Sequence, residues 1–260
     1  MITYEEIRNN EVIKTYINAA DDSLSALGYT EHSFAHVTYV AEKAGSILET
    51  LGYPERMIEL TKIAGYMHDI GNVINRVDHS QSGAVMAFRI LDNMHMDPAE
   101  IAMIISAIGN HDEGSGVPVS PMAAALILAD KSDVRRNRVR NDDMSTFDIH
   151  DRVNYSVKKS ELKINESHTI IKLKLFVDTH YGSVMDYFEI FMQRMMLCRK
   201  AAAGENGAEP ALRHGDGDPG ADLHGGVRGD LHRGVQAGAE VIARNADEPH
   251  VFREIKLAAV

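Results

Sequence analysis

Several segments of this sequence end an apolar helical stripe on a histidine or an aspartate, the residue types that bind transition metals. One buried histidine in such a stripe is more often a hydrogen-bonded core residue than a ligand. A carboxylate that stays ionised in an apolar interior, however, needs a nearby cation. No arginine or lysine shares these stripes, so a metal ion is the cation that the pattern favours. The residues that end the stripes are His36, the adjacent His68 and Asp69, His111 and Asp130.

The order and spacing of these residues resemble those of the HD-domain superfamily of metal-dependent phosphohydrolases. The resemblance covers about residues 28–140, with the His-Asp pair in AGYMHDIGN and Asp130 in LILADKSD. His79 in DHSQSGA resembles the His-x-x-x-Gly element of the two-metal members, and His111 in AIGNHDE resembles their next histidine. The resemblance implies two divalent ions (Fe, Mn, Co, Ni or Zn) bound by His36, His68, Asp69, His79, His111 and Asp130.

Asp69 can bridge the two ions because a carboxylate has two oxygens. We expect His36, His68 and Asp130 to complete the coordination of the first ion, and His79 and His111 to bind the second ion. The pair would supply a bridging hydroxide that attacks phosphorus, so we expect hydrolysis of a phosphate ester or anhydride, with a nucleotide as the favoured substrate. Two alternatives stay open: a catalytically silent HD module that binds a nucleotide as a sensor, and a di-iron oxygenase that uses the same ligands.

Basic residues follow the last ligand in KSDVRRNRVR. We expect Lys131 to take part in catalysis and, with Arg135 and Arg136, to bind the substrate phosphate. The alternative is a solvated helix end whose arginines pair with acids such as Asp133.

Other features limit the comparison with particular branches of the superfamily. Asn72 stands where the cyclic-di-GMP branch, HD-GYP, has lysine, and Val117 stands where it has tyrosine. The ligand set also resembles that of the symmetrical diadenosine tetraphosphate hydrolases. His32, one turn before His36, is expected to be a surface or second-shell histidine rather than a ligand of a third ion.

Helices must position most of these side chains. The apolar periodicity predicts helices over 31–51, 54–68, 80–94, 98–110 and 121–130. Asp97-Pro98 and Ser120-Pro121 are typical helix starts. Alternating apolar residues over 162–177 predict a β-hairpin, and a Met/Phe stripe over 181–200 predicts a helix that serves core packing or a subunit contact, so a homo-oligomer stays open. The expected fold is an all-α HD-domain bundle over 1–140, with a hairpin and helix appended over 141–200.

Residues 201–260 hold half of the chain's 20 glycines and few residues that could form a core. We expect this segment to be disordered or not native-like, either as coding sequence read in a shifted frame or as a natural tail that binds metal loosely.

Composition excludes several classes of protein. The formal charge of −11 argues against stable nucleic-acid binding, and one cysteine excludes a disulfide framework. The sequence has no signal-peptide pattern and no apolar run of the roughly 18 residues that span a membrane. We therefore expect a cytoplasmic protein whose partner is a phosphorylated small molecule.

Overall fold

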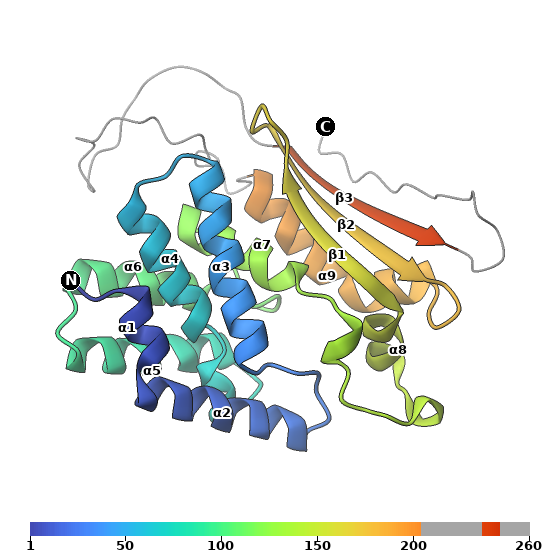
Figure 1. Cartoon of the computed structure of the whole chain (residues 1–260), viewed down its shortest axis with the longest axis horizontal. Helices are drawn as coiled ribbons and strands as arrows, with labels where there is room; N and C mark the ends of the chain where they lie inside the picture. Colours follow the sequence, from blue (N-terminus) through green and yellow to red (C-terminus); the bar gives the residue numbers. More distant parts are fainter. Residues whose placement is uncertain (204–235, 245–260) are drawn as a thin grey trace.

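The computed structural model describes residues 1–203 and 236–244. Its predominantly helical body carries a small β-sheet on one side (Figure 1), which confirms the all-α bundle with an appended hairpin and helix. The elements in chain order are α1 (Tyr4–Asn9), α2 (Glu11–Ala26), α3 (Phe34–Thr50), α4 (Glu55–Met67), the 3₁₀ helix η1 (Ile70–Val73), α5 (His79–Asn93), α6 (Pro98–Gly109), α7 (Pro121–Ser132), the 3₁₀ helices η2 (Arg136–Arg138) and η3 (Met144–Thr146), α8 (Ile149–Ser156), β1 (Val157–Ile164), β2 (Ile170–Asp178), α9 (Val184–Ala203) and β3 (Gln236–Arg244).

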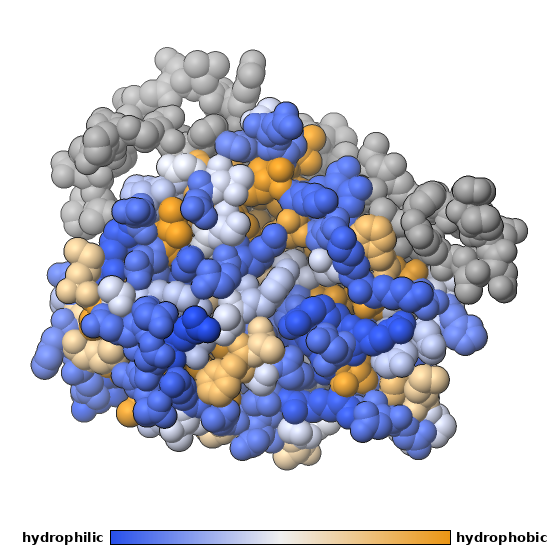
Figure 2. Space-filling view, in the orientation of Figure 1, coloured by the Kyte–Doolittle hydropathy of each residue, from blue (hydrophilic) through white to orange (hydrophobic). Residues whose placement is uncertain are grey.

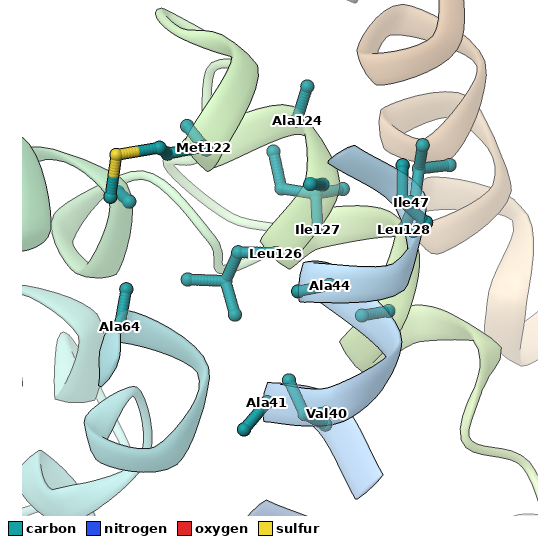
Figure 3. Close-up of a cluster of buried hydrophobic side chains, with 14 of the residues drawn as sticks. Val40, Ala41, Ala44, Ile47, Ala64, Met122, Ala124, Leu126, Ile127 and Leu128 are labelled. Carbon is teal, nitrogen blue, oxygen red and sulfur yellow. The ribbon is translucent and has the colours of Figure 1, made fainter. Parts of the chain in front are cut away.

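Helix α7 is the centre of the bundle. Its sequence is apolar almost all round, and it packs against α3, α4, α6 and α9. The close-up in Figure 3 shows Leu126 and Ile127 of α7 among Ala44 and Val40 of α3 and Ala64 of α4. Small residues on facing helices let the backbones approach closely, so the ends of α3, α4 and α7 meet in one region.

Gly71 lets the short helix η1 approach α5. A Cβ atom at Gly71 would lie 2.0 Å from the carbonyl oxygen of His79 and 2.4 Å from the backbone nitrogen of Gly83. Both neighbours are backbone atoms, which cannot turn aside as a side chain can. A glycine is therefore required where the His68-Asp69 segment passes the start of α5.

The appended elements pack on the bundle through α9, which contacts α7. Strands β1 and β2 form the expected antiparallel hairpin, with Leu162 opposite Leu173 and Val157 opposite Val177. The hairpin starts five residues earlier than predicted, because β1 follows directly on α8, a short helix that the periodicity did not predict.

The segment after residue 200 corrects part of our expectation. Helix α9 continues to Ala203, and residues 236–244 form β3, which pairs in parallel with β2. A strand can form there because backbone hydrogen bonds to an open sheet edge do not need the apolar alternation that the sequence lacks. The rest of the predicted disordered tail, 204–235 and 245–260, lies outside the described residues.

Figure 2 shows a mostly hydrophilic face with separate apolar patches. Within the described ranges, no helix combines the length and apolar composition that crossing a bilayer requires.

Candidate metal centre

Five segments bring the six predicted ligands together. They are the first turn of α3, the end of α4, the start of α5, the two residues after α6, of which the second is His111, and the last turn of α7. Five of the six side chains are buried and the sixth is half-buried; in chain order the six are His36, His68, Asp69, His79, His111 and Asp130.

The two carboxylate oxygens of Asp69 face two different pairs of histidines. Oδ2 lies 3.4 Å from Nε2 of His36 and 3.1 Å from Nε2 of His68. Oδ1 lies 3.5 Å from Nε2 of His79 and 3.9 Å from Nε2 of His111. This is the arrangement that a carboxylate bridging two ions requires, one oxygen for each.

Asp130 completes the group around His36 and His68. Its Oδ1 lies 3.5 Å from Nε2 of His36 and 3.8 Å from Nε2 of His68. Ligand atoms about 2.1 Å from one metal are separated by about 3.0–3.4 Å in octahedral or tetrahedral geometry. The observed separations therefore need only small adjustments to hold an ion.

The hydrogen bonds of the ring Nδ1 atoms direct every Nε2 atom into this space. Nδ1 of His68, His79 and His111 each donates to the carbonyl oxygen three residues earlier, over 2.8, 3.0 and 2.6 Å. Nδ1 of His36 donates to Oδ2 of Asp133 over 2.8 Å. With the proton on Nδ1, each Nε2 presents its lone pair, which is the atom a metal ion binds.

The buried polar atoms show that these residues fit a metal. Nε2 of His36 and Nε2 of His68 are buried without a hydrogen-bond partner, although each faces carboxylates. A lone pair facing a carboxylate in a dry interior is unfavourable unless a cation or a proton lies between them. Two groups of three residues offer ligand atoms within 4.8 Å of one another: His36, His68 and Asp130, and His68, Asp69 and His111.

The electrostatics differ between the ligands of the expected first ion, around His36, and those of the expected second ion, around His111. Burial lowers the pKa of His36, but the three carboxylates around its ring outweigh that effect and raise the pKa to about 10. Burial would raise the pKa of Asp69, yet the surrounding imidazoles hold it well below its usual range. Burial and the neighbouring histidines keep the pKa of His111 well below its usual range. The group of residues around His36 therefore carries most of the negative charge.

Asp133 is a functional candidate that the sequence analysis considered only as a partner for arginines. It is buried, and its oxygens accept hydrogen bonds from Arg135 Nε (2.5 Å) and Nη2 (2.9 Å) as well as from His36. Burial raises the pKa of this carboxyl, but the His36 hydrogen bond and the Arg138 charge lower it to about 2. Asp133 therefore stays ionised behind His36.

The basic cluster after α7 is divided by the structure. Lys131 lies beside the candidate ligand Asp130, with Nζ 2.7 Å from Oδ2 of Asp130 and 2.9 Å from Oε2 of Glu113. Arg135 pairs with Asp133, as the alternative interpretation expected. Arg136 donates to the carbonyl oxygen of Tyr155 and stacks between two tyrosine rings. Neither arginine lines the cavity described next, because each is held by closer partners.

A cavity of about 530 Å³ opens onto the candidate ligands. Its walls come from the α2–α3 connection, the segment before α5, the end of α7, and the appended helices α8 and α9. The appended part thus contributes to the site, which its sequence did not indicate. Lining residues outside the predicted ligands include Tyr29, His32, Arg76, Glu113, Lys131, Arg138, Phe191 and Arg194.

His32 lies beside His36 without joining either group of ligand atoms. The two ring centroids are 5.2 Å apart, and Nδ1 of His32 lies 2.6 Å from the carbonyl oxygen of Thr30. Burial keeps the pKa of His32 well below its usual range. His32 is thus a neutral side chain at the cavity wall, outside both groups of candidate ligand atoms.

Comparison with known proteins finds relatives of part of this chain. Over 191 residues the chain is 26% identical to the uncharacterized protein MJ1020 of Methanocaldococcus jannaschii, covering 64% of this chain and 73% of that protein. A predicted HD superfamily hydrolase from an uncultured Thermotogales bacterium, known from a crystal structure, is 24% identical over 48% of this chain and 67% of its own, with a TM-score of 0.38.

The family model of the HD domain matches residues 33–137, which contain all six predicted ligands. This match confirms the resemblance of residues 33–137 to the HD domain.

Proposed function

We propose that this protein is a two-metal phosphohydrolase that cleaves a phosphate ester or anhydride of a nucleotide. The observation that carries the proposal is the position of Asp69, whose two oxygens face two separate pairs of histidines at 3.1–3.9 Å. A single-ion site has no need for the second pair. His36, His68 and Asp130 would hold the first ion, His79 and His111 the second, and Asp69 both.

When bound, two divalent ions would polarise the phosphoryl oxygens and lower the pKa of the water molecule that attacks phosphorus. The protein's own groups would prepare the site for that chemistry. Lys131 lies between Asp130 and Glu113, and Arg194 donates to Oε1 of Glu113 over 2.8 Å. Burial raises the pKa of Asp130, but the Lys131 charge outweighs it and holds that pKa well below its usual range, so the carboxylate is ready as a ligand.

The size and lining of the cavity favour a nucleotide over inorganic phosphate. About 530 Å³ lies within the range of cavities that enclose an organic ligand. The aromatic rings of Tyr29 and Phe191 and the apolar side chains of Leu27 and Ile190 line it together with the cationic groups. An anionic phosphate would lie toward the ligands and a base or sugar against the apolar wall.

The test is a phosphate-release screen of metal-loaded full-length protein against nucleotides, together with elemental analysis. We expect about two transition-metal ions per chain and phosphate release that persists without oxygen. Asp69→Ala should lose most of both ions and the activity, while Asp142→Asn, a change at an exposed acid, should keep both. A thermal melt of each variant separates loss of metal from loss of fold.

Binding of nucleotides without turnover would favour the sensor alternative. Turnover that requires oxygen would favour the oxygenase, and a metal-free protein with full activity would end the proposal.

A further inference from the structure

Four cationic side chains line the cavity, and three of them have strong partners of their own. Lys131 and Arg194 share the carboxylate of Glu113. Arg138 donates to the carbonyl oxygens of Glu31 and Asp133 over 2.8 and 2.6 Å. Nη1 of Arg138 also lies 3.7 Å from Oδ2 of Asp133, so these contacts hold the three groups in place and partly neutralise all of them.

Arg76 is different. Within the described residues, no carboxylate lies within ion-pair distance of its guanidinium group. Its Nη1 lies over the face of the His79 ring, 3.1 Å from Nε2 and 3.3 Å from Nδ1, and 3.5 Å from Oδ1 of Asn72. The guanidinium carbon lies 5.7 Å from the centre of the Tyr29 ring. Arg76 therefore carries an uncompensated positive charge at the wall of the cavity, steadied by an aromatic face.

The contact with His79 places a positive charge beside the atom that the second ion would need. Nδ1 of His79 donates to the carbonyl oxygen of Arg76, so Nε2 is the acceptor. Because Nη1 of Arg76 is nearly equidistant from the two ring nitrogens, it lies over the ring face and leaves the Nε2 lone pair open to a metal ion. An ion on His79 would therefore lie close to the guanidinium charge, and the repulsion between the two cations would favour an anion that contacts both.

We propose that Arg76 binds a phosphate group of the substrate and that, without phosphate, its positive charge disfavours the second ion at His79. This inference rests on the proposed function and deepens it. A phosphate at the second ion would accept two parallel N–H groups from the guanidinium of Arg76, a geometry that arginine matches and lysine does not. Occupancy of the second site would then depend on phosphate.

Replacing Arg76 should change the binding of metal and of phosphate in opposite directions. In Arg76→Gln, the positive charge beside His79 is gone, so the second Mn²⁺ should bind severalfold more tightly. Inorganic phosphate should bind to the Mn²⁺-loaded variant about 10- to 100-fold more weakly, the scale of a hydrogen bond to a charged group. Arg76→Lys should keep part of the phosphate affinity.

The experiment titrates chelator-treated full-length protein with Mn²⁺, followed by electron paramagnetic resonance, and then titrates the loaded protein with inorganic phosphate in a calorimeter. Arg89→Gln is the matched control, because Arg89 lies on α5 with a side chain that is 71% exposed. Phosphate should tighten the second Mn²⁺ in the wild type more than in Arg76→Gln, since binding couplings are reciprocal.

Equal weakening of both ligands in Arg76→Gln would assign Arg76 a structural role and overturn the inference. Unchanged phosphate affinity would overturn it as well. Because neither titration depends on turnover, a protein that shows the opposite shifts but hydrolyses no nucleotide would refute the proposed function and leave the anion site standing.

Discussion

Replacing Asp133 by asparagine tests whether a carboxylate behind a ligand sets the affinity of the first ion. Of the four candidate ligand histidines, three direct Nδ1 to a backbone carbonyl oxygen and only His36 directs it to a carboxylate. A carboxylate makes the imidazole more basic than a carbonyl does, and it fixes the ring in place. The asparagine side chain can still accept the bond, so the change removes charge rather than the contact.

The expected magnitude follows from this geometry. Removing such an outer partner typically costs 10- to 100-fold in metal affinity, about 1.4–2.8 kcal/mol. The first ion should weaken by this factor, while the second should change little, because His79 and His111 have no contact with Asp133. The loss of charge opposite Arg135 and Arg138 should also lower the free energy of unfolding by about 1.5–3 kcal/mol.

The assay is a Mn²⁺ titration of wild type, Asp133→Asn and Asp142→Asn, with thermal melts of the metal-free proteins alongside. The control removes one negative charge at an exposed position, so it reports any effect of net charge alone. Equal weakening of the two ions would show that Asp133 acts on the whole fold. An unchanged first ion in Asp133→Asn would refute the reasoning from the hydrogen bond.

Three further predictions concern packing, charge and a thiol. Gly71→Ala should lower the free energy of unfolding by at least about 1–3 kcal/mol in urea denaturation, because its Cβ would meet backbone atoms at 2.0–2.4 Å. The control Gly109→Ala, where the nearest neighbours of a Cβ lie at 3.7 Å, should cost under about 1 kcal/mol. Equal costs for the two variants would contradict the packing argument. Lys131→Met should destabilise the protein by about 3–5 kcal/mol, because it leaves buried carboxylates unpaired. This loss of stability should be smaller in a Glu113→Gln background. Additive losses in that double-mutant cycle would count against the ion pair. Burial raises the pKa of the Cys198 thiol to about 12. Iodoacetamide at pH 8 should therefore label this thiol about 10³-fold more slowly in the folded protein than in urea, and the labelling rate of the folded protein should rise with pH as thiolate forms. Equal rates in the two states would show an accessible, ordinary thiol.

The helices of the metal-binding part could be predicted closely from local signals. The segments 54–68 and 98–110 correspond to Glu55–Met67 and Pro98–Gly109. Asp97 accepts hydrogen bonds from the backbone nitrogens of Ala99 and Glu100, and Ser120 accepts one from Ala123, as capping residues before proline are expected to do. Such patterns can be read from sequence because periodicity and caps depend only on neighbours within a few residues.

The appended elements were harder to predict. Helix α8 has eight residues, so its apolar period is too short to stand out. Strand β3 pairs with β2 across nearly sixty residues of chain, and its sequence does not alternate. Their position beside the cavity depends on contacts between distant segments, which local patterns do not record.

The sequence by itself determined which side chains could bind metal and that apolar helix faces carry them inward. Tertiary structure decided how they are used: that the two oxygens of Asp69 face different histidine pairs, that Asp133 supports His36, and that Arg76 rather than Arg135 or Arg136 reaches the cavity. The reason is physical. Residue type and spacing fix which face of a helix a group lies on, whereas the direction of each oxygen and each guanidinium is set by the packed neighbours that compete for its hydrogen bonds.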